Sequence, residues 1–244
     1  MKTVIFLAIV LVSGALAGTI HGIANLAIVE PYLDEAIGIE NQNLFASGEE
    51  EDTPQFRAEY DAYRNWQKGG QILAGAILGT SIGALFGIVY ALSRNSLKGK
   101  NDIQKTFVLA GIMWLTMYLI PFLKYPANPP TVGDGETVVL RAILYLSFIA
   151  ISGFGAVGFY QIYKRLKQNT KVLAIACYAV FIGMVFVLMP PNPDEITAPM
   201  DLVNGFRAMS VVAVSVFWVS VAVILGGLWH KFGPDSHVSV TKNQ

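Results

Sequence analysis

The side chains of His21, Asn25 and Glu30 are the first candidates for chemistry, because they lie within or at the end of a long apolar stretch. Steps of three or four residues return to the same face of a helix, so His21 and Asn25 share one stripe. At 1.5 Å per residue, His21 lies about 13 Å from the end of the stretch next to Glu30. A histidine at that depth in a membrane needs a partner. We therefore expect either a ligand or proton-relay role for His21 or a hydrogen bond to a neighbouring helix.

Two arginines, Arg141 and Arg207, lie one or two helical turns inside other apolar segments, at the predicted depth of Glu30. Charged groups inside a membrane usually pair with one another. The sequence therefore predicts an ion pair between Glu30 and Arg141 or Arg207. The alternative is that both arginine side chains extend outward to the lipid headgroups.

Six apolar segments must position these residues. A helix needs about 20 apolar residues to cross the hydrocarbon core, and the chain is 54% apolar but only 14% charged. We expect an all-α polytopic transmembrane bundle, a single membrane domain over residues 1–244, with spans at about 4–29, 70–92, 106–122, 138–160, 172–189 and 209–229. Lys2 and Ala15–Ala17 also resemble a cleavable signal peptide, which would leave five spans. The apolar stretch continues to Val29, and this length favours six.

The charges of the connecting loops predict the orientation. Basic residues follow the second span (Arg94, Lys98, Lys100, Lys105) and the fourth span (Lys164, Arg165, Lys167, Lys171). Basic loops stay in the cytoplasm, so both termini are expected on the cytoplasmic side of the cell membrane. Residues 30–69 carry ten acidic residues and are expected outside. Within them, the aromatic residues of 54–68 predict a short interfacial helix.

Glycines recur at every fourth position in the first two spans. Small residues at this spacing let two helix backbones approach closely in lipid. We therefore expect helix packing at Gly14, Gly18 and Gly22 in the first span and at Gly75, Gly79, Gly83 and Gly87 in the second.

Several function classes have no support in the sequence. It contains no GxxxxGK[ST], HExxH or GxSxG motif and only one cysteine, Cys177. Nucleotide-driven chemistry, hydrolysis and a cysteine-based metal cluster are therefore not expected. Because the formal net charge is zero, nucleic acid is not an expected partner. We predict a protein that is not an enzyme and has no permanently bound cofactor.

Two proline-rich segments follow the third and fifth spans. They read PFLKYPANPPTVGDGET (residues 121–137) and LMPPNPDE (residues 188–195). Proline ends helices and restricts the residue before it, so each segment should form a stiff cap outside the membrane. Candidates for an external gate in the first segment are Lys124, Tyr125, Pro126, Asn128, Pro129 and Pro130.

The string PFLKYPANPPTVGD resembles a hallmark of the CbtA family, predicted membrane subunits of a cobalt transporter. Further agreement covers the Glu30-Pro31 pair, ETVVLRAILY at the fourth span, and PPNPDE followed by NGFRAMS. The resemblance implies a cobalt(II) permease subunit linked to cobalamin biosynthesis, with a small histidine-bearing partner similar to CbtB. Cobalt(II) accepts imidazole and carboxylate ligands, which makes His21 and Glu30 the predicted metal ligands.

Other functions fit the same architecture. Glycine-mediated packing and stiff caps would also suit a structural or assembly subunit of a larger membrane complex, as a homo- or hetero-oligomer. A permease for nickel or a corrinoid precursor would differ only in its substrate. The sequence leaves these alternatives open.

Overall fold

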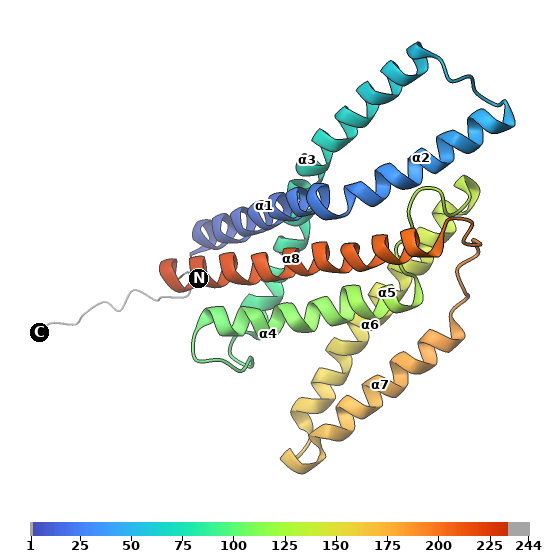
Figure 1. Cartoon of the computed structure of the whole chain (residues 1–244). Coiled ribbons are helices and arrows are strands. Elements are labelled where there is room, and N and C mark those ends of the chain that lie inside the picture. The colour runs from blue at the N-terminus through green and yellow to red at the C-terminus, as the bar shows by residue number, and fades with distance from the viewer. Residues whose placement is uncertain (1, 234–244) are drawn as a thin grey trace, which may run out of the picture. The chain divides into compact units, whose positions relative to one another are not determined.

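The computed structural model describes residues 2–233, and these form helices and no strand (Figure 1). Six helical stretches are long and apolar enough to cross a membrane, which confirms the predicted all-α fold with six spans. They are α1 (Thr3–Ile28), α3 (Pro54–Ser93), the stretch Asp102–Lys124, α6 (Val138–Arg165) extended at its start by the 3-10 turn η2 (Gly135–Thr137), α7 (Lys171–Leu188) preceded by the 3-10 turn η3 (Gln168–Thr170), and α8 (Met200–Phe232).

The predicted outer loop, residues 30–69, is mostly helical. Helix α2 spans Glu30–Ser47 and ends at Gly48, whose φ of 75° is the left-handed conformation that glycine adopts readily. Helix α3 then begins at Pro54, where Thr53 accepts a hydrogen bond of 3.1 Å from the Phe56 N–H. The segment expected to be a short interfacial helix is thus the first part of α3. The pair Gly69 and Gly70 does not interrupt it, because each glycine costs only about 1 kcal/mol in a helix.

The third span changes its helical pitch at mid-length. It consists of α4 (Asp102–Trp114), the π-helix η1 (Leu115–Leu119) and α5 (Ile120–Lys124). The Ile120 N–H donates to the carbonyl of Leu115, five residues earlier. Pro121 follows immediately and has no N–H to continue the α-helical pattern. Single π-turns of this kind are frequent at functional sites.

Residue contacts divide the chain into two units, which are described separately. Unit 1 comprises residues 1–31, 43–111 and 209 onward, and unit 2 comprises residues 32–42 and 112–208. In unit 1, α1 and α3 cross each other (Figure 1) and are in extensive contact. In the same unit, the Trp229 ring of α8 meets Tyr90 edge-on at 4.9 Å and Phe6 at 5.8 Å. Trp229 and Tyr90 are fully buried.

In unit 2, α6 and α7 run side by side and join through η3 (Figure 1). Tyr125, Leu144 and Phe148 form a buried cluster between these helices and the end of the third span. The outward faces of α6 and α7 carry apolar side chains, among them Phe154 and Val187, each 79% exposed. Exposed apolar faces on membrane-length helices are the surfaces that lipid covers.

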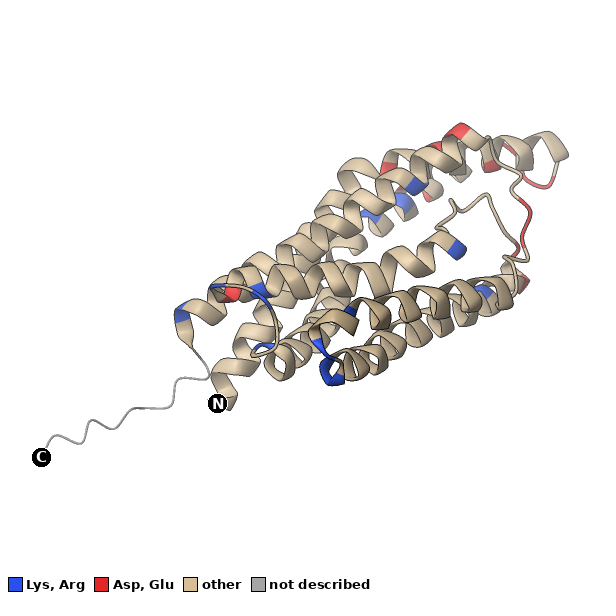
Figure 2. Cartoon of the chain, turned by 90° about the horizontal axis from the view of Figure 1, so that it is seen from below, with Lys and Arg blue, Asp and Glu red and all other residues tan. Residues whose placement is uncertain are grey.

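Acidic and basic side chains gather at different connections (Figure 2). The connection between α2 and α3 carries Glu49, Glu50, Glu51 and Asp52, whereas basic residues surround the turns between α3 and α4 and between α6 and α7. The hydrogen bond from the Arg57 guanidinium holds the pKa of Asp52 below its ordinary value. The cytoplasmic location of both termini stays a prediction that rests on this distribution of charge.

Candidate functional site

The glycine faces of α1 and α3 lie against each other. A Cβ atom built on Gly79 would lie 2.5 Å from the carbonyl oxygen of Gly14 and from the Cα of Gly18. Gly83 meets the Gly14 backbone in the same way, and Gly22 and Gly75 extend the contact. Gly87 instead faces the side chain of Val10. The two backbones touch, and this crossing fixes the position of the polar residues on the same faces.

His21 forms a hydrogen bond from α1 to α8. Its Nδ1 lies 2.9 Å from the carbonyl oxygen of Ala213. A carbonyl can only accept, so Nδ1 carries the proton, and Nε2 keeps its lone pair. Among the described residues Nε2 has no hydrogen-bond partner. Nδ1–H bonded to a carbonyl is the arrangement that orients many metal-binding histidines, so His21 can supply one ligand.

A chain of hydrogen bonds follows the glycine crossing toward the start of α2. Asn25 donates to the Gln71 side chain at 3.0 Å, and Gln71 donates to one carboxylate oxygen of Glu30. The other oxygen of Glu30 accepts from Arg64, which also donates to Gln67 at 2.7 Å. Glu30 is only 3% exposed and Arg64 only 9%. The network is therefore an ion pair with amide partners, removed from solvent.

This network gives Glu30 a partner that the sequence did not indicate. Arg141 and Arg207 were the expected partners, but the ion pair forms with Arg64. Arg64 was overlooked because its segment was expected to lie apart from the second span. Once α3 is continuous from Pro54, Arg64, Gln67 and Gln71 lie on one face, because they are three and four residues apart. Both oxygens of Glu30 are occupied, so it could bind a metal only after Arg64 or Gln71 moved away.

A second buried polar cluster lies at the other end of α3. Asp102 accepts hydrogen bonds of 2.7 Å from the Tyr90 hydroxyl and from Nε of Arg94. His230 Nδ1 lies 3.7 Å from the same carboxylate. Burial lowers the pKa of Arg94, but the hydrogen bond and charge of Asp102 and the contact with Tyr90 together raise this pKa above its ordinary value. Sequence reasoning used Arg94 only as a loop charge and missed this link between α3, α4 and α8.

In unit 2 the two proline-rich segments bind each other and the start of α8. The Tyr125 hydroxyl donates to the carbonyl of Pro190 at 2.6 Å. Arg207 donates to Asn128 Oδ1 at 2.7 Å and to the carbonyl of Ala127 at 3.3 Å. No carboxylate among the described residues pairs with Arg207. We call the two bound segments, residues 125–134 and 189–198, the proline cap.

Arg141 joins this cap through a carboxylate. Its Nε lies 2.7 Å from Asp194, whose other oxygen accepts a 2.7 Å hydrogen bond from Thr137. Arg141 also donates to the carbonyl of Asp134 at 3.0 Å. Gly133 fits beside this pair with a φ of 110°, a conformation that other residues rarely adopt. The partner of Arg141 is thus Asp194 of the second proline-rich segment.

The other gate candidates lie around the same cap. Pro129 is fully buried and Pro130 is exposed, while the ammonium of Lys124 lies 5.0 Å from the centre of the Phe186 ring. Pro126 lines a cavity beneath the cap.

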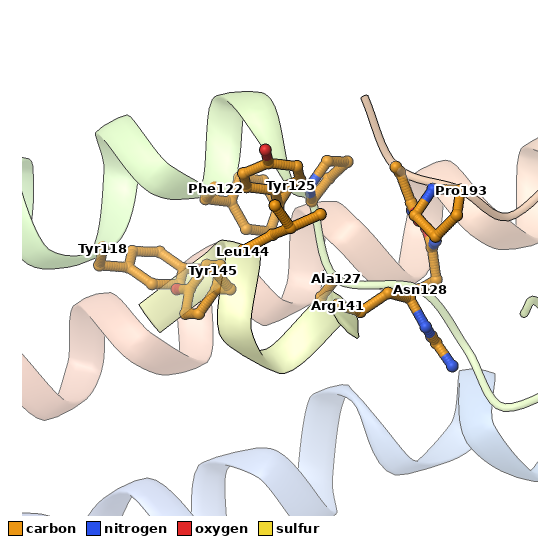
Figure 3. Close-up of a pocket in the computed structure, with 11 residues that line it drawn as sticks. Tyr118, Phe122, Tyr125, Ala127, Asn128, Arg141, Leu144, Tyr145 and Pro193 are labelled. Atoms are coloured by element: carbon orange, nitrogen blue, oxygen red, sulfur yellow. The ribbon is translucent and has the colours of Figure 1, made fainter. Parts of the chain in front are cut away.

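This cavity of unit 2 has a volume of about 370 Å³, within the range of small-molecule sites. Tyr118 and Tyr145 lie next to each other at one end, and Asn128, Arg141 and Pro193 lie at the other (Figure 3). The walls between them are Phe122, Tyr125, Pro126, Ala127, Leu144 and Asn192. Aromatic rings and prolines thus surround a small number of amide, guanidinium and hydroxyl groups.

The hydroxyl of Tyr118 is buried and has no hydrogen-bond partner among the described residues. Tyr118 belongs to the π-helix, so the change of pitch helps set its direction. Burying a hydroxyl without a partner costs free energy. A water molecule or a ligand in the cavity can supply the partner of this hydroxyl.

Within residues 2–233, no three histidine, cysteine, aspartate or glutamate side chains lie close enough together to hold a metal ion. Neither of the predicted ligands, His21 and Glu30, therefore belongs to such a group in the described part of the chain.

Comparison with known protein families identifies the family of this chain. The model of a family described as probable cobalt transporter subunit (CbtA) matches residues 4–230. Searches of curated proteins and of solved structures found no match. The family match covers all six membrane-length helices, the His21 and Glu30 network, and the proline cap. This chain therefore belongs to the CbtA family of probable cobalt transporter subunits.

Proposed function

We propose that this chain is the membrane permease subunit of a cobalt(II) uptake system, linked through its family to cobalamin biosynthesis. The observation that carries the proposal is the family match, which extends over residues 4–230 and includes every predicted span. Cobalt(II) is the transported substrate in this proposal, and the bilayer is the surrounding medium. The chain acts as a carrier without enzymatic chemistry.

The histidine in α1 supports a role for this chain in ion passage. His21 is anchored through Nδ1, which leaves Nε2 as a ligand of fixed direction. Cobalt(II) binds imidazole well, but a single histidine cannot complete its coordination shell. We propose that a small histidine-bearing partner, of the kind implied by the family, supplies further ligands.

Uptake of radioactive cobalt into proteoliposomes tests the proposal. The vesicles contain the chain alone or with its small partner, and unlabelled cobalt, nickel and zinc compete in parallel. Saturable uptake that unlabelled cobalt suppresses best supports the permease. Absence of uptake from both preparations refutes it.

One substitution separates the ligand role of His21 from its structural role. In His21→Asn, the side-chain amide nitrogen takes the place of Nδ1 and can still donate to Ala213, but the Nε2 lone pair is lost. We expect this variant to fold and to lose most cobalt uptake. His21→Ala removes both functions, and equal loss of folded protein in both variants would assign His21 to packing alone.

A second candidate function is that of an assembly subunit. It is favoured by the absence of a three-ligand metal cluster among the described residues. A stable stoichiometric complex with an enzyme after gentle purification, together with no cobalt uptake, would establish this function.

A further inference from the structure

The connection between α6 and α7 is strongly basic (Figure 2). Its four basic residues are Lys164, Arg165, Lys167 and Lys171. None of their side chains forms an ion pair with a carboxylate among the described residues. The sequence has no acidic residue between Glu136 and Asp194, and the length of α6, 28 residues or about 42 Å, separates Glu136 from the connection. The connection therefore carries four positive charges and no negative one.

Two tyrosines hold part of this charge together. The rings of Tyr160 and Tyr163 are stacked, with their centroids 6.3 Å apart. The ammonium of Lys164 lies 5.0 Å from the centre of the Tyr160 ring, and the ammonium of Lys171 lies 5.0 Å from the centre of the Tyr163 ring. Tyrosines at the ends of membrane helices are typical of the level of the lipid headgroups. Two ammonium groups from different helices thus share one pair of rings, and an anion beside them would relieve their repulsion.

Exposed apolar side chains begin directly beside this basic connection. They include Phe154 and Val157 on α6 and Val172 and Ile175 on α7. Acyl chains cover such faces on membrane-length helices. The same two helices thus present cationic groups for a phosphate and apolar faces for acyl chains. This combination fits a phospholipid better than free phosphate, which has no apolar part.

We propose that the connection between α6 and α7 binds an anionic phospholipid of the surrounding bilayer. The four basic side chains hold the phosphate, the two tyrosine rings lie at the level of the headgroup, and the exposed faces of α6 and α7 contact the acyl chains. Clusters of basic residues beside a membrane helix attract anionic lipids in this way. A zwitterionic lipid binds less well, because its own cation offsets its phosphate. The inference goes beyond cobalt transport and does not depend on it.

The connection between α3 and α4 is also basic but differs in its contacts. Its Arg94 is bound to Asp102 at 2.7 Å, so one of its positive charges is already compensated. Its lysines Lys98 and Lys100 are exposed. Neither of them lies over an aromatic ring among the described residues. Lys98 and Lys100 therefore provide a matched control for the effect of removing charge from a basic loop.

Native mass spectrometry of the purified full chain tests the inference. Phosphatidylglycerol or phosphatidylcholine is added to the chain in detergent, and the spectra count the lipid molecules that stay bound. The chain should retain phosphatidylglycerol at lower lipid concentrations than phosphatidylcholine. Equal retention of the two lipids would overturn the inference. Displacement of phosphatidylglycerol by an equal concentration of inorganic phosphate would also overturn it, because the site would then recognise phosphate without acyl chains.

Two double variants locate the bound lipid. Lys164→Gln with Lys167→Gln should weaken phosphatidylglycerol binding at least about tenfold, because each basic residue near an anionic lipid contributes about fivefold. Lys98→Gln with Lys100→Gln removes the same charge from the other connection and should bind this lipid normally. All four lysines are exposed, so both variants should fold, and circular dichroism verifies this.

Replacing Lys164 and Lys167 by arginine keeps the charge and should keep the binding. Equal losses in the two glutamine variants, or no loss when Lys164 and Lys167 become glutamine, would refute the assignment. Uptake of cobalt by the parent chain is measured separately, so the proposed transport can fail without affecting this result.

Discussion

The crossing of α1 and α3 allows a prediction in which two effects of one substitution oppose each other. Replacing glycine by alanine in a helix gains about 1 kcal/mol from the backbone preference. At Gly79 the added Cβ would lie 2.5 Å from the Gly14 oxygen, about 0.9 Å short of ordinary van der Waals contact. At Gly70, in the same helix, the added atom meets nothing within 4 Å. The two positions therefore separate the backbone preference from the packing.

The magnitude at Gly79 follows from the required movement. The neighbouring atoms belong to backbone and cannot rotate away, so the helices must separate by most of that 0.9 Å. A gap of 0.5–1 Å removes about a quarter to a half of the dispersion energy of the contacts concerned. Overpacking of this kind typically costs about 1–3 kcal/mol. We therefore expect Gly79→Ala to lower the free energy of unfolding by about 1–2 kcal/mol and Gly70→Ala to leave it unchanged or raise it slightly.

Unfolding of the purified chain by sodium dodecyl sulfate in mixed micelles measures this difference. Tryptophan fluorescence is a suitable signal, because Trp229 contacts Phe6 of α1 and Tyr90 of α3. A shift in the Gly79→Ala midpoint toward lower detergent fraction, absent for Gly70→Ala, is the expected result. Equal midpoints for the two variants would refute the argument, because the crossing would then tolerate the extra atom.

Three further predictions concern the polar groups and the cap. Arg64→Met should destabilise the chain by about 3–5 kcal/mol, because it leaves the Glu30 carboxylate buried and uncompensated. Adding Glu30→Leu should restore most of this loss in the same unfolding assay. A double variant as unstable as Arg64→Met would contradict this explanation. Burial raises the pKa of Tyr125 above its ordinary value of 10.0. The contribution of Tyr125 to the free energy of unfolding is therefore complete below about pH 10 and is lost as the pH rises through the raised pKa. Above pH 10, the free energy of unfolding should fall less steeply with pH for Tyr125→Phe than for the parent chain. Equal slopes would contradict the role of Tyr125. Gly133→Ala should lower the free energy of unfolding by about 1–3 kcal/mol, because Gly133 has a φ of 110°. Gly135→Ala should leave it unchanged, because a Cβ at Gly135 meets nothing within 4 Å. Equal unfolding midpoints for the two variants would show that the cap adapts without strain.

The six spans were predictable because hydrocarbon imposes a length and a composition that are read directly from the sequence. The ends of the spans were harder to place, since a helix can continue into water. Residues 54–68 are polar enough to lie outside the membrane, yet the structure continues them into the second span as one helix of 40 residues. The helix at residues 30–47 was not expected either, because acidic and apolar residues alternate there without a clear period.

The partners of the charged groups could not be predicted for a related reason. Depth along a helix is proportional to residue number, so Glu30, Arg141 and Arg207 could be placed at similar depths from the sequence. Which helices are neighbours is a property of packing, and the sequence indicated it only where glycines repeat. Arg141 has its partner in Asp194, in the loop between the fifth and sixth spans, and no periodic pattern connects the two.

The chemistry of the two polar regions leads to one view of how metal selectivity arises. In unit 1 the described residues provide one free imidazole nitrogen and a carboxylate that is already paired. In unit 2 they provide amide, hydroxyl and guanidinium donors, and the guanidinium of Arg141 is paired with Asp194. Among the described residues, neither set contains a group of three histidine, cysteine or carboxylate side chains that could replace the water of a divalent cation. We therefore expect selection among cobalt, nickel and zinc to depend on the ligands that a partner subunit adds to His21.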